Sequence, residues 1–225
     1  LTSPFDINTV EIDASAEVIF VADLYVEDYV GGAELTTDAL IRSSDMKIQK
    51  LHSKDVTMDL LAAGVHKHWV FGNIAGLSPD LIPSIIGNMS YSILEYDYKF
   101  CAYRSIEKHK EATGTECDCH EQLHGKLISS FFHAAKSIWW MSEAQERRYL
   151  DRFPFLEDNN RIVLSSVFDE NFFAAVRHLN NENRESDRST WVVLGSESWI
   201  KGTDDAVQYC EENNLDYEVL KNVPY

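Results

Sequence analysis

Short apolar runs alternate with amphipathic segments along the chain. The run Val18-Ile19-Phe20-Val21-Ala22 is apolar at every position, which is typical of a parallel strand buried on both faces. Further strands are expected at residues 47–51, 68–71, 90–94, 137–141, 161–164, 191–194 and 217–220. Strands that alternate with helices predict an α/β fold, a doubly wound, Rossmann-like parallel sheet with helices on both faces.

Helix signals lie between these runs. Ser78-Pro79 and the capping-box pattern Ser142-Glu143-Ala144-Gln145 each predict a helix start. Helices are expected at residues 31–43, 56–63, 78–88, 123–135 and 204–212, after Ser142, and after Asp169 with Phe172, Phe173, Val176 and Leu179 on one face. The stretch from Tyr96 to Cys119 shows no clear period, so it is expected to be functional or flexible.

A purely polar segment runs from Asn180 to Asp187, and such a segment is typical of a linker. The predicted organisation is therefore a first domain over residues 1–180, a linker over 181–189, and a second β-α-β unit over 190–225.

The charge balance restricts the partners. The chain of 225 residues has 37 acidic and 20 basic residues, a net charge of −17, which repels nucleic acid and anionic membranes. An anionic ligand must then be held by backbone N–H groups, helix N-termini or a few placed cations. No apolar run approaches the ~20 residues of a membrane-spanning helix, and the N-terminal residues do not resemble a signal peptide. We therefore expect a cytoplasmic protein with free thiols and no transmembrane segment.

The turn Gly31-Gly32-Ala33-Glu34 joins the first strand to the first helix. Two glycines there either let the backbone approach an anion at the helix N-terminus or serve a tight turn that needs positive φ. The turn lacks the G-x-G-x-x-G spacing and the Walker lysine. A second turn, from Gly195 to Gly202, repeats the arrangement and carries Lys201 just before a helix.

These two turns resemble those of the retaining group 1 glycosyltransferases, which have the two-domain GT-B fold. Gly31-Gly32-Ala33-Glu34 resembles the glycine-rich turn of their first domain, and Lys201-Gly202 resembles the end of the G-R-L-x-x-x-K-G turn that opens their second domain. The resemblance implies transfer of a sugar from a nucleotide-sugar donor to a carbohydrate or other hydroxyl acceptor. It implies no metal and no cofactor, with the nucleotide sugar as substrate.

The resemblance also assigns roles residue by residue. By matched position, the first turn places Gly31, Gly32 and Glu34 against the donor diphosphate, and the second turn adds Ser196 and the diphosphate-binding Lys201. Glu34 also orients substrate. Ser196 stands where the family has an arginine, and the family's cleft histidine has no match in the Glu95 to Tyr98 region. Because the chain ends at Tyr225, we expect residues 190–225 to be the truncated start of the donor domain and this chain to be inactive alone.

Other polar and aromatic side chains follow the central strands. Asp97 is a candidate to bind acceptor hydroxyls or act as a base, and Tyr96 and Tyr98 to stack on a sugar, unless they form a turn with packing aromatics. Ser142 and Glu143 are candidate acceptor contacts, although capping explains them sufficiently.

Cys117-Asp118-Cys119-His120 with His124 suggests zinc, but C-x-C departs from the usual spacing. Cys101 either completes such a set or forms a disulfide with Cys117 or Cys119, and we expect no metal. The alternatives to a glycosyltransferase are a non-catalytic ligand-binding or scaffold domain of the same fold, and a nucleotide-sugar epimerase.

Overall fold

A computed structural model describes residues 10–168, 170–182 and 190–221. Its contacts divide the chain into two compact units between Val167 and Phe168. The expected boundary at residue 180 lies inside a helix of the second unit. Most of the expected linker, residues 183–189, and the expected helix cap Asp169 lie outside the described residues.

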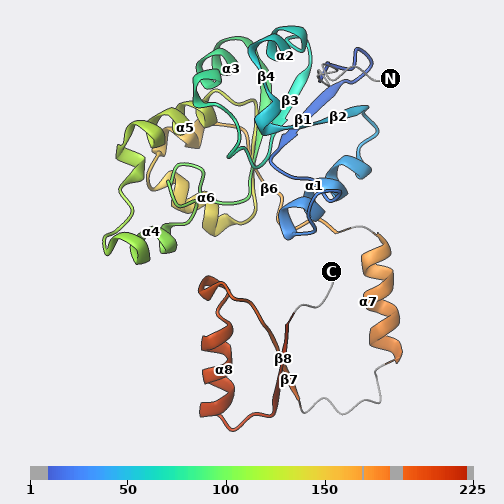
Figure 1. Ribbon diagram of the computed structural model, residues 1–225, viewed down its shortest axis with the longest axis vertical. Coiled ribbons are helices and arrows are strands. Elements are labelled where there is room, and N and C mark those ends of the chain that lie inside the picture. The colour runs from blue at the N-terminus through green and yellow to red at the C-terminus, as the bar shows by residue number, and fades with distance from the viewer. Residues whose placement is uncertain (1–9, 169, 183–189, 222–225) are drawn as a thin grey trace, which may run out of the picture. The chain divides into compact units, whose positions relative to one another are not determined.

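The first unit is an α/β domain with a six-stranded parallel sheet (Figure 1). The strand order is β2-β1-β3-β4-β5-β6, and the register aligns Phe20 of β1 with Lys50 of β2 and Val70 of β3. In chain order its elements are β1 (Val18–Ala22), α1 (Gly32–Ser43), β2 (Ile48–His52), α2 (Met58–Ala63), β3 (His68–Phe71), α3 (Ile82–Asn88), β4 (Ser90–Glu95), α4 (Ile106–Thr113), α5 (Leu123–His133), β5 (Ile138–Trp140), α6 (Glu143–Leu150) and β6 (Arg161–Val163).

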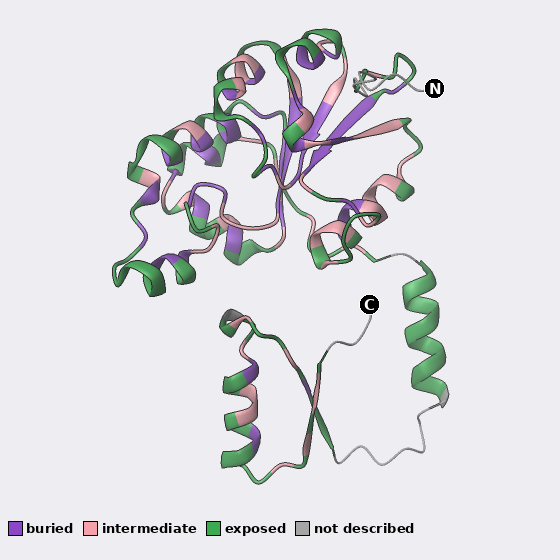
Figure 2. Ribbon diagram, viewed as in Figure 1, coloured by how far each residue is buried: buried purple, intermediate pink, exposed green. Residues whose placement is uncertain are grey.

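Alternating positions of β1 supply two hydrophobic clusters, one on each face of the sheet. Ile19 and Val21 face a cluster that includes residues of α2, α3, α5 and α6, whereas Val18 and Phe20 face Leu40 and Ile41 of α1 and their neighbours. All five β1 residues are buried (Figure 2). The expected double-sided α/β sheet is thus confirmed at the level of fold class.

The second unit is a small β-α-β arrangement preceded by a helix. Its elements are α7 (Glu170–Glu182), β7 (Trp191–Leu194), α8 (Thr203–Glu212) and β8 (Tyr217–Leu220). The strands β7 and β8 pair in parallel. On α7 the residues Phe172, Phe173, Val176 and Leu179 are exposed.

Three local expectations differ from the structure. A 3₁₀ turn over Pro79–Leu81 precedes α3, and among the described residues no side chain, Ser78 included, caps that turn. The helix expected from Val56 begins at Met58, where the Thr57 hydroxyl accepts from the Leu60 N–H. The stretch without a clear period contains α4, which Ser105 caps at its start and Gly114 at its end.

Candidate functional site

The strand order of the first sheet reverses between β1 and β3. The chain passes from β1 to the edge strand β2, and then to β3 on the other side of β1. In parallel α/β sheets, ligands bind beyond the carboxyl ends of the strands at such a reversal. The residues that follow β1, β3 and β4 therefore define the candidate site.

The turn after β1 ends in the two glycines that open α1. Gly31 precedes the helix with φ −137° and ψ 174°, and no side chain of a described residue caps this helix end. The alternative that the glycines serve a positive φ is therefore excluded, since neither Gly31 nor Gly32 has one. The first-turn N–H groups of α1, which begin at Gly32, have no intrahelical acceptor, and a Cβ added at Gly32 would meet nothing within 4 Å. The backbone at Gly32 is accordingly open to close approach.

Glu34 lies over this turn. Its Oε2 atom is 2.5 Å from the position that a Cβ on Gly31 would take. A carboxylate in the first turn is favourable for the helix dipole. An anionic ligand at Gly31 must therefore displace the Glu34 side chain, whereas a hydroxyl can donate to it.

Tyr96, directly after β4, connects this turn to the centre of the sheet. Its hydroxyl lies 2.6 Å from the Thr37 hydroxyl of α1, and burial raises the Tyr96 pKa further above its ordinary value. The hydrogen bond brings the β4 end and the first half of α1 together at the carboxyl edge. Tyr96 is thus held by Thr37, a residue that the sequence did not single out.

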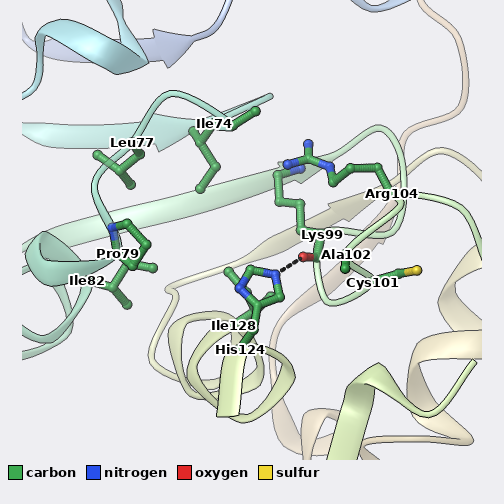
Figure 3. Close-up of a pocket in the computed structure, with 11 residues that line it drawn as sticks. Ile74, Leu77, Pro79, Ile82, Lys99, Cys101, Ala102, Arg104, His124 and Ile128 are labelled. Carbon is green, nitrogen blue, oxygen red and sulfur yellow. Dashed lines mark hydrogen bonds between the residues drawn. The ribbon is translucent and has the colours of Figure 1, made fainter. Parts of the chain in front are cut away.

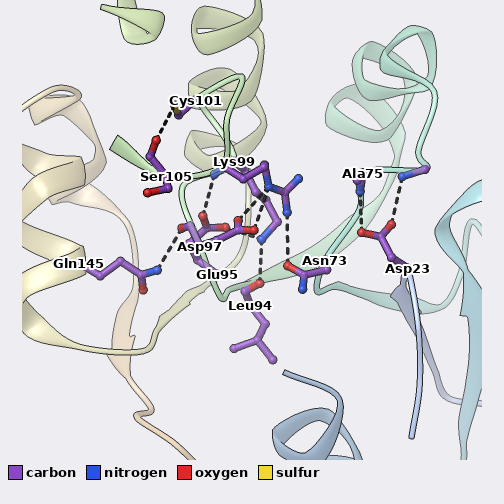
Figure 4. Close-up of polar contacts among 12 residues, drawn as sticks. Asp23, Asn73, Ala75, Leu94, Glu95, Asp97, Lys99, Cys101, Ser105 and Gln145 are labelled. Carbon is purple, nitrogen blue, oxygen red and sulfur yellow. Dashed lines mark hydrogen bonds and ion pairs between the residues drawn. The ribbon is translucent and has the colours of Figure 1, made fainter. Parts of the chain in front are cut away.

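Asp97 lies in an ion pair with Arg104 (Figure 4). The Arg104 Nε donates to both Asp97 carboxylate oxygens, at 3.0 and 2.9 Å, and Nη2 donates to Asn73 Oδ1 at 3.3 Å. Burial lowers the pKa of Arg104, but the Asp97 carboxylate outweighs that effect, so the net shift is upward. The guanidinium therefore stays charged, and the predicted base Asp97 is already engaged.

Arg104 has a strained backbone. Its φ of 56° lies in the left-handed region, which costs of order 1 kcal/mol or more for a residue with a side chain. Such strain is concentrated at ligand-binding sites. Neither Arg104 nor Asn73 was predicted as a site residue. The position of Asn73 two residues after β3 was the available signal, whereas no periodic pattern marks Arg104.

A pocket of about 380 Å³ opens beside Arg104 (Figure 3). Polar groups of Lys99, Arg104 and His124 line one part of it, and His124 Nε2 hydrogen-bonds to the Lys99 carbonyl at 2.9 Å. The remaining lining is largely apolar: Ile74, Ala75, Leu77, Pro79, Ile82, Cys101, Ala102 and Ile128. A cavity with an apolar wall, a guanidinium and an imidazole suits a small organic ligand with hydroxyl or anionic substituents.

A buried ion pair lies under this edge. Glu95, at the end of β4, and Lys99 are 0% and 1% exposed, and the Lys99 ammonium donates to Glu95 Oε2. The Tyr149 hydroxyl donates to Glu95 Oε1 at 2.6 Å. Burial raises the Glu95 pKa, and the Lys99 charge offsets part of that shift. Because solvent does not reach this carboxylate, it is a structural group.

Asp23 joins the loop after β1 to the loop after β3. Its carboxylate accepts a hydrogen bond from the N–H group of Ala75 at 2.9 Å (Figure 4). It also accepts from the N–H group of Gly76 at 3.0 Å and from the Ser53 hydroxyl. These contacts fix one rim of the carboxyl edge.

The residues after β5 adopt the predicted cap. The Ser142 hydroxyl accepts from the Gln145 N–H at 3.1 Å, and Gln145 Nε2 donates to the Asp97 carbonyl at 3.0 Å. Glu143 is exposed in the first turn of α6. Tyr98 stacks on Tyr149, and its hydroxyl accepts from Arg148. One face of the Tyr98 ring is therefore occupied by packing within the protein.

In the second unit, Ser196 and Lys201 lie in the loop between β7 and α8. The Ser196 N–H donates to the Thr203 hydroxyl at 3.0 Å, and Lys201 is exposed. Gly202 has φ 71°, in the left-handed region that favours glycine. Lys201 is thus accessible to an anion at this loop.

Three cysteines and one histidine come together beside the first unit's carboxyl edge. Cys101, His109, Cys117 and Cys119 are buried, and their ligand atoms lie within 4.8 Å of one another. All three of these cysteines, and also Cys210, are free thiols, so no disulfide joins Cys101 to Cys117 or Cys119. The histidines that the sequence suggested as ligands, His120 and His124, are not part of this cluster.

Comparison with known proteins gives no assignment. No protein-family model matches the chain, and no curated protein sequence matches it. Among the described residues, no helix has the length and apolar character needed to cross a membrane.

Proposed function

We propose that this protein is a glycosyltransferase that moves a sugar from a nucleotide-sugar donor to a hydroxyl acceptor with retention of configuration. The observation that carries the proposal is the reversal of the parallel strand order between β1 and β3. At that reversal the open N-terminus of α1 and the segment after β4 share one edge, as the Thr37–Tyr96 hydrogen bond indicates. Ligands of doubly wound sheets bind at this edge.

In the proposed reaction, the first unit binds the acceptor and also contributes backbone donors. The N–H groups near Gly31 and Gly32 stabilise negative charge that develops on the leaving diphosphate. Glu34 and Asp97 orient hydroxyl groups through hydrogen bonds, and Arg104 keeps the Asp97 carboxylate in place at 2.9–3.0 Å. Lys201, exposed in its own loop of the second unit, is assigned to a diphosphate only by the resemblance of its turn.

A second candidate is a ligand-binding domain without catalysis. Both oxygens of Asp97 accept from Arg104, and Glu95 is fully buried with Lys99. Neither carboxylate is free to remove a proton in this conformation, which favours binding over acid–base chemistry. Retaining sugar transfer can proceed by electrostatic stabilisation of the leaving group and needs no strong protein base. The engaged carboxylates are therefore compatible with a glycosyltransferase, which we prefer to the non-catalytic domain.

Calorimetric titration with nucleoside diphosphates and their sugar derivatives tests both candidates. Binding, together with release of nucleoside diphosphate from a nucleotide sugar by the protein, supports the glycosyltransferase. Binding without release supports the ligand-binding domain. If neither binding nor release occurs with any of the compounds, both candidates are rejected.

A matched pair of variants locates the binding. In Gly32→Ala the added methyl meets no atom within 4 Å, and the same is true of Gly87→Ala in α3. Both changes favour the helix slightly. If the ligand approaches the backbone of α1, Gly32→Ala weakens binding about tenfold and Gly87→Ala leaves it unchanged. Equal ligand affinities of the two variants would mean that the ligand does not bind at the N-terminus of α1.

A further inference from the structure

Cys101, His109, Cys117 and Cys119 form a cluster with the composition of a metal site. Cys101 follows β4, His109 lies on α4, and Cys117 and Cys119 lie between α4 and α5. The four residues are 0–7% exposed. Their four ligand atoms, three Sγ and one imidazole nitrogen, all lie within 4.8 Å of one another. Three segments of the chain therefore direct four ligand atoms at one point.

The distances agree with tetrahedral coordination. Zinc binds sulfur at about 2.3 Å and imidazole nitrogen at about 2.0–2.1 Å, so a tetrahedron separates sulfur from nitrogen by roughly 3.5 Å. In the structure, His109 Nδ1 is 3.3 Å from Cys119 Sγ and 3.8 Å from Cys101 Sγ. These values bracket the tetrahedral separation.

The other nitrogen of His109 faces a carboxylate beyond hydrogen-bond distance. His109 Nε2 lies 4.0 Å from the Asp118 carboxylate. A carboxylate behind a ligating imidazole fixes its tautomer and increases its basicity. Zinc ligation through Nδ1 requires the tautomer that is protonated at Nε2, the atom that lies toward Asp118.

We propose that these four residues bind one zinc ion in a structural Cys₃His site. Three thiolates and an imidazole favour zinc over harder cations such as magnesium or calcium, and four protein ligands leave no open position for catalysis. A single disulfide would use only two of the three thiols, whereas a metal ion engages all three together with the imidazole.

The proposed ion holds the long connection between β4 and α5. Its helix α4 buries only Ile106 and His109, so apolar packing alone gives this segment little support. Cys101 lies three residues before Arg104, and the N–H of Arg104 donates to the Cys101 carbonyl at 2.9 Å. The zinc site thereby fixes the turn that presents Arg104 to the pocket.

Metal content per chain tests the proposal. The protein is purified under reducing conditions from zinc-supplemented medium, and its metals are measured by mass spectrometry. Wild type is expected to hold about one zinc ion, which is lost in His109→Ala and retained in His120→Ala, the variant of the histidine that directly follows Cys119. His109→Cys restores four ligands and is expected to retain the metal, which separates loss of a ligand from loss of folding.

Cobalt substitution and chelation give independent readouts. Co²⁺ added to the metal-free chain is expected to produce thiolate-to-cobalt charge-transfer absorption and tetrahedral d–d bands. Chelation is expected to lower the melting temperature by roughly 8–16 °C, and added zinc to restore it. The proposal is overturned if reduced wild type holds no zinc or holds a different metal instead, or if His109→Ala retains as much zinc as His120→Ala.

Discussion

Replacement of Lys99 by methionine isolates the energetic role of the buried ion pair at the end of β4. In wild type, the Lys99 ammonium donates to Glu95 Oε2 and to the Leu94 carbonyl, the latter at 3.2 Å. The variant leaves the Glu95 carboxylate 0% exposed in its original site, with the Tyr149 hydroxyl and the backbone N–H of residue 99 as remaining donors. Removing one partner of a buried pair costs about 3–5 kcal/mol. Because two donors remain, we expect a loss near the lower end of that range.

The stability that Lys99→Met loses is expected to increase with pH. Burial raises the Glu95 pKa above its ordinary value of 4.5, and loss of Lys99 removes the charge that offsets this shift. A carboxyl group whose folded pKa is raised destabilises the fold as pH rises through that pKa, and the penalty disappears below the unfolded pKa. Lys99→Met is therefore expected to lose more stability at about pH 8 than at about pH 5.

Urea unfolding at both pH values measures the effect. The double variant Glu95→Gln/Lys99→Met removes the buried charge and is expected to recover most of the lost stability. Lys110→Met, in which an exposed ion pair with Glu116 is removed, serves as the control and should unfold like wild type. A loss below about 1 kcal/mol for Lys99→Met, equal at both pH values, would refute the reasoning.

Three further substitutions test contacts around the same edge. Tyr149→Phe removes the 2.6 Å hydrogen bond to Glu95, and we expect urea unfolding to show a loss of about 1.5–3 kcal/mol; an unchanged midpoint would mean that the bond contributes nothing net. Ser142→Ala removes the α6 cap and should cost about 0.5–2 kcal/mol in the same assay, so a neutral result would argue against the cap. Asp23→Asn leaves one acceptor oxygen for the N–H groups after β3. We expect the free energy of unfolding to fall by about 1–2 kcal/mol and hydrogen exchange at Ala75 to become faster. Unchanged exchange would mean that the carboxylate does not hold this loop.

The strands and most helices of the first unit were predictable because local signals agree with tertiary burial. The run from Val18 to Ala22 is apolar throughout and buried on both faces of the sheet. His68–Phe71 in the first unit and Trp191–Leu194 in the second occur as expected. The capping box at Ser142 was predictable because it depends only on residues within one helical turn.

The segment after β4 was not predictable in the same way. Helix α4 buries only two residues, Ile106 and His109, so it carries almost no apolar periodicity. The ion pair of Glu95 and Lys99 arises where a strand turns back into a loop, and no regular spacing marks such a contact. The metal cluster depends on His109, which is eight residues from Cys101 and Cys117, whereas spacing directed attention to the neighbouring His120 and His124.

The glycine turn shows where residue type alone is ambiguous. A glycine pair is compatible with a positive φ or with close approach of a ligand, and only coordinates separate the two. Gly31 is extended at φ −137°, and the space beside Gly32 is open. A need for positive φ therefore does not explain the glycine pair, and close approach of a ligand stays a prediction.

Equilibrium titration of the chain with nucleoside diphosphates is the most direct test of the central claim, that the β1–β3 edge of the first unit binds the substrate of a glycosyltransferase. Amide resonances of Gly31 and Gly32 report on the location by NMR. We predict saturable binding that shifts these two amides and weakens about tenfold in Gly32→Ala, with no change in Gly87→Ala. Absence of binding by every nucleoside diphosphate and nucleotide sugar, or binding that leaves both amides unshifted, would contradict it.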